Sequence, residues 1–249
     1  MKDYTVIDLE MTGLDPKTET ILEVGAIRVR EHAVADTLQF FVQPGRKIPE
    51  KISKLTGITQ QMADGGITRQ EALQRVTDFV GEDVLVGHNL IFDYSFLKQL
   101  AVNERVPFEK KAVDTLKLAR KLLAEPEKKS LDSLCAYYHL GNENRHRALD
   151  DCEATMELFE LLQREYATEH EADFVPKPLQ YRPKRQTPVT PAQLRQLEEL
   201  VEYHRLEKED ICRLLKRDID GWEESSLTRS ECSRLTDRIL AHYGRIHRD

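Results

Sequence analysis

The sequence predicts an α/β protein, with a mixed β-sheet covered by helices, followed by a small helical module. Three strand patterns lie close together in the first 42 residues, which is typical of an antiparallel meander. Short apolar strands then alternate with amphipathic helical patterns, which is typical of βαβ units with parallel pairing. A proline-rich stretch separates these elements from a last segment with its own helix-start signals. We therefore expect an α/β domain at residues 1–168, a linker at 169–188 and a helical accessory module at 189–249.

The expected sheet has five strands. Three are expected at residues 4–10, 21–29 and 34–42, and two short apolar ones at 84–86 and 112–114. Helices are expected where apolar residues recur every three to four positions behind a capping residue such as Thr68 or Ser130. Their approximate places are residues 68–80, 90–102, 115–123, 130–138 and 147–166, and the segments after Thr190 and Thr228.

Composition limits the classes of protein that the chain can represent. Hydrophobic and charged contents of 40% and 33% are typical of a soluble globular protein, and no apolar run approaches the roughly 18 residues needed to cross a membrane. The four cysteines show no paired spacing, so we expect free thiols in a reducing compartment. The chain begins with a strand instead of a signal segment, which favours the cytoplasm. A net charge of −7 argues against a broad basic surface for nucleic acid but does not exclude a nuclease.

The first strand carries two carboxylates on one face. Side chains alternate across a strand, so Asp8 and Glu10 share a face with Val6, while Ile7 and Leu9 share the other. Two carboxylates on a buried face are costly unless they share a cation, and oxygen ligands of this kind suit Mg²⁺ or Mn²⁺. On these residues alone, a solvent-facing edge strand with two surface acids is the simpler interpretation.

Two helices each place another aspartate toward the core. Asp93 lies on the apolar stripe of its helix and Asp151 on that of the long helix, whereas Asp150 is rotated away by about 100°. Either aspartate alone could be a buried residue that the helix dipole stabilises. Four acids cannot share a small interior without cations, so the complete set favours a metal site. His146, five residues before Asp151, is then well placed to take a proton from a water.

The order and spacing of these residues resemble the signature of 3′→5′ exonucleases of the DEDDh type. This group includes the proofreading subunit of bacterial DNA polymerase III and the exonuclease domain of PolC-type polymerases. The resemblance covers roughly residues 3–166 and implies a ribonuclease H-like fold with a five-stranded mixed sheet. Its motifs are Asp8-x-Glu10, Asn89-x-x-Phe92-Asp93 and His146-x-Ala148-x-x-Asp151, with lesser matches at Leu55-Thr56-Gly57-Ile58-Thr59 and Asp114-Thr115-Leu116.

The resemblance implies an enzyme that releases nucleoside 5′-monophosphates from the 3′ end of single-stranded nucleic acid, with DNA favoured. It implies two divalent cations, Mg²⁺ or Mn²⁺, which activate the attacking water and stabilise the leaving oxygen. Asp8 would contact both ions, Asp93 would support one of them, and His146 would be the general base. The implied metal ligands are Asp8, Glu10, Asp93 and Asp151, and His146 completes the catalytic set.

The turn after the first strand is expected to line a pocket for the terminal nucleotide. Gly13 would allow close backbone approach, and Met11 or Leu14 would press on a base, although an ordinary strand-end turn is the alternative. Asn89 either contacts the substrate or only caps the following helix, and His88 is interpreted as structural. The expected substrate-binding residues are Met11, Thr12, Gly13, Leu14 and Asn89.

Two other functions remain open at this point. The segments Asp8–Asp15 and His146–Asp151 also resemble oligoribonucleases, which would make short RNA the substrate. A non-catalytic, polymerase-associated binding module is the non-enzyme alternative, but an inactive version is expected to lack one of the acids or the histidine. Expected partners are single-stranded 3′ ends and a DNA polymerase or another replication or repair protein, with no membrane. The aromatic residues Tyr203, Trp222 and Tyr243 form either the core of the last segment or a surface for stacking or protein contact.

Overall fold

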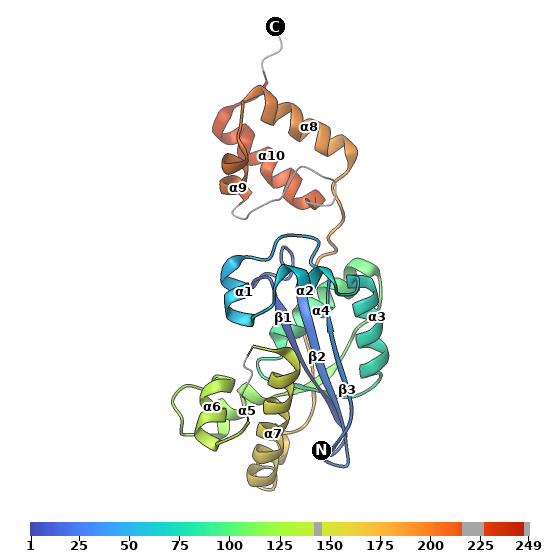
Figure 1. Cartoon of the computed structure of the whole chain (residues 1–249), viewed down its shortest axis with the longest axis vertical. Coiled ribbons are helices and arrows are strands. Elements are labelled where there is room, and N and C mark those ends of the chain that lie inside the picture. The colour runs from blue at the N-terminus through green and yellow to red at the C-terminus, as the bar shows by residue number, and fades with distance from the viewer. Residues whose placement is uncertain (142–145, 216–226, 247–249) are drawn as a thin grey trace. The chain divides into compact units, whose positions relative to one another are not determined.

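The computed structural model describes residues 1–141, 146–215 and 227–246. It divides into two compact units, Met1–Lys184 and Arg185–Asp249, which are drawn in Figure 1. The first unit contains one mixed sheet, so the expected α/β class is confirmed. Its strands, in their order across the sheet, are β3 (Ala33–Phe41), β2 (Ile21–Arg30), β1 (Tyr4–Met11), β4 (Leu85–Gly87), β5 (Lys111–Asp114) and β6 (Lys177–Pro178). No helix among the described residues is long and apolar enough to cross a bilayer.

Three antiparallel strands and two parallel strands make up most of the sheet. They begin and end within one residue of the places that sequence periodicity predicts. Parallel pairing of β1 with β4 and of β4 with β5 brings the carboxyl ends of these three strands to the same edge of the sheet.

A sixth strand, β6 (Lys177–Pro178), pairs antiparallel with β5 and lies in the segment expected to be a linker. Two residues are too few to show a hydrophobic period, so no sequence pattern indicates this strand. A proline is tolerated there because an edge strand leaves one side of its backbone unpaired. Phe174, just before β6, is buried, with its ring centroid 6.3 Å from that of Phe159. The chain up to Lys184 is therefore part of the first unit.

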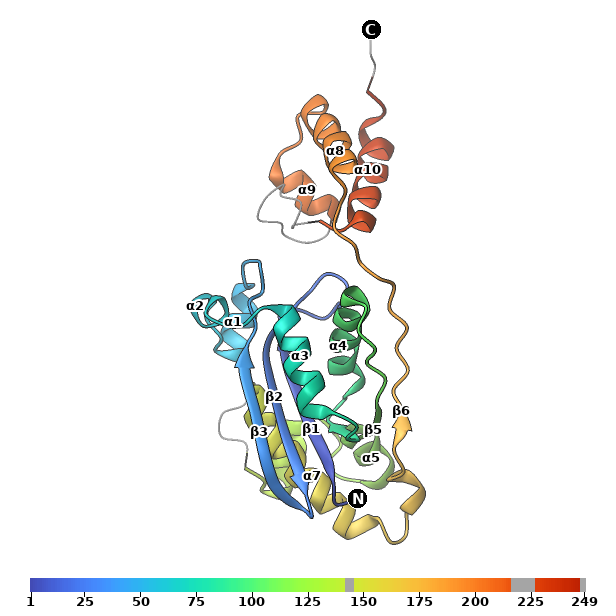
Figure 2. The same cartoon turned by 90° about the vertical axis from the view of Figure 1, so that its right-hand side faces the viewer.

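Helices cover both faces of the sheet, as Figure 2 shows. Ile7 and Leu9 of β1 pack on the face covered by α3 and α4, whereas Tyr4 and Val6 pack on the face covered by α7. The expected alternation along the first strand is thus present, and it directs Asp8 and Glu10 to the α7 side. The helices are α3 (Arg69–Val80), α4 (Ile91–Glu104), α5 (Thr115–Leu122), α6 (Leu131–Tyr138) and α7 (Ala148–Tyr166).

Two further helices, α1 (Glu50–Thr56) and α2 (Gln60–Asp64), have no counterpart among the expected ones. They are too short to show a clear helical period. Gly57 ends α1 in the left-handed region at φ 71°, and the Thr59 side chain caps the N-terminus of α2. They form a small core of their own beside β2, which consists of Leu22, Ile48, Ile58 and Ala63.

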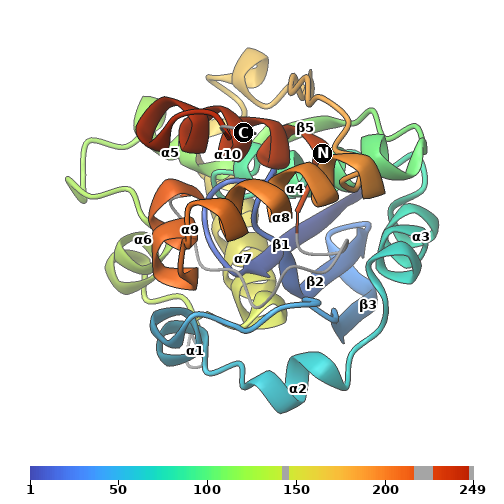
Figure 3. The same ribbon diagram turned by 90° about the horizontal axis from the view of Figure 1, so that it is seen from above.

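The second unit contains the helices α8 (Pro191–Tyr203), α9 (Lys208–Leu215) and α10 (Arg229–Tyr243), which are visible in Figure 3. Complete capping boxes begin α8 at Thr190 and α10 at Thr228, as the sequence predicts. Its buried cluster is mainly aliphatic, while Tyr203 and Tyr243 are 45% and 43% exposed. These two tyrosines are therefore surface residues and not the core of the unit, and Trp222 lies outside the described residues.

We predict that a chain ending at Lys184 is more stable than one ending at Thr168. The shorter chain loses β6 and the buried Phe174, and loss of a buried phenylalanine costs about 3 kcal/mol. At about 2–4 °C per kcal/mol, the melting temperature of the shorter chain should be lower by about 10 °C. Circular dichroism melting measures the difference. In the longer chain, Phe174→Ala should reproduce most of the decrease in melting temperature. Val175→Ala is the control and should not, because Val175 is 53% exposed. Equal melting temperatures of the two chains would contradict the prediction.

Candidate active site

Asp8 and Glu10 lie toward the end of β1, on the face that α7 covers. Both side chains are half-buried, and their neighbours Val6 and Leu9 are buried. The antiparallel register with β2 places Glu10 directly opposite Glu23, whose side chain is fully buried. This end of the sheet therefore holds three carboxylates on adjacent strands. Because β1 pairs with both β2 and β4, the simpler interpretation of a solvent-facing edge strand is excluded.

Asp93 reaches the same place from the first turn of α4. It is 5% exposed, and its Oδ1 accepts a hydrogen bond of 3.1 Å from the backbone N–H of Leu9. Earlier in β1, the Thr5 N–H donates to the Val84 carbonyl as part of the pairing with β4. Because β4 stops at Gly87, the Asp93 carboxylate takes the place of the next strand carbonyl. One backbone hydrogen bond thus fixes this aspartate against β1.

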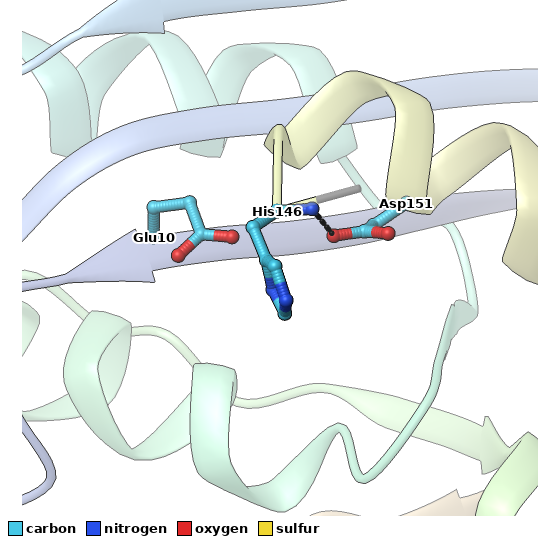
Figure 4. A group of neighbouring side chains, drawn as sticks. All are labelled: Glu10, His146 and Asp151. Atoms are coloured by element: carbon cyan, nitrogen blue, oxygen red, sulfur yellow. Dashed lines mark hydrogen bonds between the residues drawn. The ribbon is translucent and has the colours of Figure 1, made fainter. Parts of the chain in front are cut away.

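Asp151 and His146 come from the N-terminus of α7. One ligand atom from each of Glu10, His146 and Asp151 lies within 4.8 Å of the others. The backbone N–H of His146 donates to Asp151 Oδ2 at 3.2 Å, and His146 has a left-handed backbone at φ 63°. Figure 4 shows the Glu10 and Asp151 carboxylates on either side of the histidine, with this hydrogen bond drawn as a dashed line. Asp151 is buried and Asp150 only half-buried, which agrees with the predicted phase of the helix.

The burial of these carboxylates and their close approach raise the pKa values of several of them. Burial, followed by the charge of Asp151 and then those of Glu23 and Asp93, raises the pKa of Glu10 to about 8. Burial and the charges of Asp93 and Asp151 also raise the pKa of Asp8 well above its usual range. Burial raises the pKa of Asp93 too, although hydrogen bonds from backbone N–H groups oppose the shift. Without cations, these side chains cannot all be ionised at neutral pH.

The residues expected to line a nucleotide pocket lie in different environments. Met11 is buried in the core, and Thr12 is buried with its hydroxyl engaged, because it donates to Glu19 at 2.6 Å and accepts from the Thr20 N–H. Gly13 is half-buried. Leu14 is 81% exposed, the most exposed of the large apolar side chains in the described residues. The structure thus leaves Leu14 available for contact with another molecule, while Met11 and Thr12 support the turn from inside.

Asn89 lies in the turn between β4 and α4, with a left-handed backbone at φ 61° and an exposed side chain. The residue that caps α4 is Leu90, without a side-chain hydrogen bond, so Asn89 is not the cap. Its backbone N–H donates to Asp114 Oδ1 at 3.1 Å, and the same oxygen accepts from the N–H groups that begin α5. His88 contacts Thr115 Oγ1 and the Lys129 carbonyl, both at 2.9 Å, which fits the structural role interpreted for it.

Sequence reasoning missed Glu23 and Gly25, which join α7 to the sheet. Glu23 binds Arg147, the N-cap residue of α7. A Cβ on Gly25 would lie 2.3 Å from the backbone carbon of Ala148, so only glycine permits this close approach. A charged residue inside the apolar strand Ile-Leu-Glu-Val-Gly-Ala was the available signal, because a buried acid requires a partner.

The family model RNase_T, described as Exonuclease, matches residues 5–159. The chain belongs to the RNase_T exonuclease family. The matched range contains all four inward acids and His146, and the resemblance to the exonucleases of DNA polymerase III is confirmed. We refer to this part of the chain as the exonuclease domain.

The exonuclease domain is similar to parts of two kinds of replication protein. The DNA polymerase III PolC-type of Clostridium perfringens (strain 13 / Type A) is 38% identical over 156 residues, which are 63% of this chain and 11% of that protein. The DNA polymerase III subunit epsilon of Aquifex aeolicus (strain VF5) is 36% identical over 157 residues, which are 63% of this chain and 78% of that subunit. The chain therefore spans only about a tenth of the length of the PolC-type relatives that it matches.

Solved structures share the fold of the exonuclease domain. Exonuclease X in complex with 5′ overhanging duplex DNA is 24% identical with a TM-score of 0.54, over 66% of this chain and 93% of that one. The nuclease domain of 3′hExo, a DEDDh family member bound to rAMP, is 24% identical with a TM-score of 0.58 and the same two coverages of 66% and 93%. At this identity the similarity concerns the fold, and it confirms the ribonuclease H-like architecture.

We predict that the metal-free protein loses stability as the pH rises from about 5 to about 8. An acid whose pKa is raised on folding, as for Glu10 with a value of about 8, binds more protons in the folded state across this window. Ionisation therefore costs folding free energy as pH increases. Melting temperatures in chelator should fall through this range, and added Mn²⁺ at the upper end should restore them.

The variant Asp93→Asn should flatten this pH dependence, because the amide oxygen can still accept from Leu9 while the repelling charge is gone. Asp150→Asn, on the same end of α7 as Asp151 but off the core stripe, is the control and should keep the full slope. A melting temperature that rises with pH in chelator would show that the acids are not destabilising each other.

Proposed function

We propose that the exonuclease domain is a metal-dependent 3′→5′ exonuclease that acts on single-stranded nucleic acid, preferentially DNA, and releases nucleoside 5′-monophosphates. The observation that carries the proposal is the convergence of four inward carboxylates and His146 at one end of the sheet in a chain of this family. The similarity to DNA polymerase III proteins supports DNA as the substrate.

The metal ligands in this proposal are Asp8, Glu10, Asp93 and Asp151. A donor set of several carboxylate oxygens suits Mg²⁺ or Mn²⁺. The raised pKa of Glu10 supports this assignment, because a bound cation would offset both the burial and the repulsion that favour its protonated form. Two divalent cations held here would activate a water and stabilise the oxygen that leaves the phosphorus.

His146 is the general base in this proposal, and takes a proton from the attacking water. Its ring nitrogen belongs to the same close group as the Glu10 and Asp151 carboxylates. The hydrogen bond from its backbone N–H to Asp151 fixes the turn from which the ring projects. A water between these side chains would therefore lie near the proposed base and two proposed metal ligands.

Leu14 and Asn89 are the proposed contacts to the terminal nucleotide. Both are exposed, and they follow β1 and β4, two parallel strands whose carboxyl ends lie at the same edge of the sheet. Loops at that edge are the usual place for ligand contacts in α/β folds. Gly13 remains a proposed backbone contact, while Met11 and Thr12 act behind the turn by fixing its conformation.

The proposed partners are single-stranded 3′ ends and a DNA polymerase or another replication or repair protein. The similarity to the PolC-type polymerase and to the epsilon subunit supports these partners, because both relatives are DNA polymerase III proteins. Short RNA is the alternative substrate that the motifs Asp8–Asp15 and His146–Asp151 suggest. The second unit, Arg185–Asp249, is proposed as an accessory module that does not complete the active site.

The test is digestion of 5′-labelled single-stranded DNA, long RNA and dinucleotides under identical salt and Mg²⁺. A 3′→5′ exonuclease produces a ladder that shortens from the unlabelled end, and chromatography of the products identifies nucleoside 5′-monophosphates. Asp8→Ala should be inactive but folded, and a chelator should abolish activity. Activity that survives exhaustive chelation would overturn the metal-dependent mechanism, and preferential loss of dinucleotides would favour the short-RNA alternative.

We predict that His146→Ala lowers the single-turnover rate by about 10²–10⁴-fold, which is the usual contribution of a positioned general base. Asp151→Asn should be equally severe, because Asp151 both binds metal and holds the His146 turn. Asp150→Asn is the matched control and should remain within a few-fold of the original rate. A severe Asp150 variant beside a nearly normal Asp151 variant would show that the assignment along α7 is wrong.

We predict that a chain ending at Lys184 keeps the single-turnover rate on saturating short single strands. All proposed catalytic residues and the whole sheet lie before this point. Any loss should appear as weaker binding to longer substrates or to a partner protein, where the exposed Tyr203 and Tyr243 could contribute. A well-folded truncated chain that has lost most of its rate would place the second unit in the active site.

A further inference from the structure

We propose that the ion pair between the buried Glu23 and the half-buried Arg147 positions the N-terminus of α7, and with it His146 and Asp151, against the acids of β1. Neither Glu23 nor Arg147 belongs to the proposed metal or catalytic set. The inference rests on the proposed function, since it assigns these residues to the same active site.

The carboxylate of Glu23 is fully buried and receives donors from three residues. Arg147 Nη2 donates to Oε1 at 2.9 Å and Arg147 Nε to Oε2 at 3.1 Å, which is a two-point arginine–carboxylate contact. Gln39 of β3 donates to Oε1 at 2.8 Å, and the backbone N–H of Ala148 approaches Oε2 at 3.4 Å. The group therefore links three separate elements, β2, β3 and the start of α7.

The position of Arg147 in the chain makes this contact relevant to the active site. Arg147 directly follows His146 and is the N-cap residue of α7, while its neighbour Ala148 is the first residue of the helix. Holding Arg147 and Ala148 on Glu23 fixes the chain immediately after the left-handed His146. Asp151 then follows on the first turn and accepts the His146 N–H. A shift at Arg147 would thus move the proposed base and one proposed ligand together.

Beneath the ion pair, the first turn of α7 packs directly on the backbone of β2 at Gly25. The Ala148 backbone lies over Gly25, where a Cβ would be 2.3 Å from the Ala148 carbon. Cys152 Sγ, one turn farther along, lies 3.2 Å from the Gly25 carbonyl oxygen. The Arg147 guanidinium also lies over the Phe41 ring, at 5.5 Å from its centroid. Gly25 permits the close contact between α7 and β2, and the ion pair fixes where along β2 the helix begins.

The ion pair also affects the negative charge at the proposed active site. Glu23 lies opposite Glu10, so an unpaired carboxylate here would add another negative charge beside the four inward acids. The bound guanidinium compensates that charge and occupies both carboxylate oxygens, which keeps Glu23 from acting as a further ligand. The pair therefore sets both the placement of α7 and the number of acids that face the metal position.

The first unit contains a matched control on the same strand. Arg30, near the other end of β2, contacts both oxygens of Asp83 at 2.8 Å and is exposed to a similar degree, 38% against 33% for Arg147. Arg→Lys keeps the positive charge at either site. At Arg147 it also removes a two-nitrogen contact, whereas Arg30 contacts Asp83 through the single nitrogen Nη2. Arg30→Lys therefore tests whether weakening an arginine–carboxylate contact elsewhere on β2 has the same effect on the proposed active site.

The experiment compares Arg147→Lys, Glu23→Gln and the control Arg30→Lys in the full chain. Three quantities are measured for each: the melting temperature, the Mg²⁺-dependent single-turnover rate with its half-saturating substrate concentration, and the affinity for Mn²⁺ by electron paramagnetic resonance. We expect Arg147→Lys and Glu23→Gln to lose about 10- to 100-fold in rate or Mn²⁺ affinity, with little change in half-saturation. Arg30→Lys should stay within about twofold in both.

The outcomes separate positioning from a purely structural role. Folded Arg147→Lys and Glu23→Gln proteins with normal rate and Mn²⁺ affinity would overturn the proposal, even if their melting temperatures fall. Failure of both to fold would overturn it too, because the pair would then serve the fold as a whole. If the unsubstituted protein degrades no nucleic acid, the proposed function fails instead, and the Mn²⁺ affinities still decide whether the pair positions the acids.

Discussion

Repulsion among buried and half-buried carboxylates at the end of β1 is the constraint on which the rest of this structure depends. Asp8 and Glu10 share one face of a central strand, and Asp93 and Asp151 approach them from two helices, so each raises the cost of ionising the others. Such a cluster is not a source of folding stability. It is tolerated because the surrounding layers are well packed, with both faces of β1 covered by apolar side chains.

The two helices bring their acids to β1 by different physical means. On one side, β4 ends early, and the first turn of α4 places Asp93 where it accepts the next backbone N–H of β1. On the other side, α7 lies so close to β2 that only a glycine fits beneath Ala148. Because α4 and α7 pack on opposite faces of the sheet, their acids can meet only beyond the ends of the parallel strands. The edge at which β1, β4 and β5 end is therefore the one place where this set can assemble.

The second unit is organised on separate principles. Its helices begin at local capping boxes and enclose an aliphatic core of their own, and its buried acid Glu231 belongs to the capping box of α10. The family match ends at residue 159, and Exonuclease X and the nuclease domain of 3′hExo each cover 66% of the chain, so these similarities concern the exonuclease domain. The exposed tyrosines at the ends of α8 and α10 belong to the surface of the second unit.

The sequence by itself determined what depends on residues near one another along the chain. Alternation along β1 assigned Asp8 and Glu10 to one face, helical phase separated Asp151 from Asp150, and side chains such as Thr190 and Thr228 marked helix starts. Short elements without a full period, such as α1, α2 and β6, gave no comparable signal.

Only the tertiary structure decided the contacts between distant segments. Glu23 and Arg147 are 124 residues apart in sequence, and their pairing depends on strand register and on the close approach at Gly25. Leu14 and Met11 looked equivalent as apolar residues of one turn, but one is exposed and the other lies in the core. Periodicity reports which way a side chain points within its own element, whereas burial and partners depend on what the rest of the chain places in front of it.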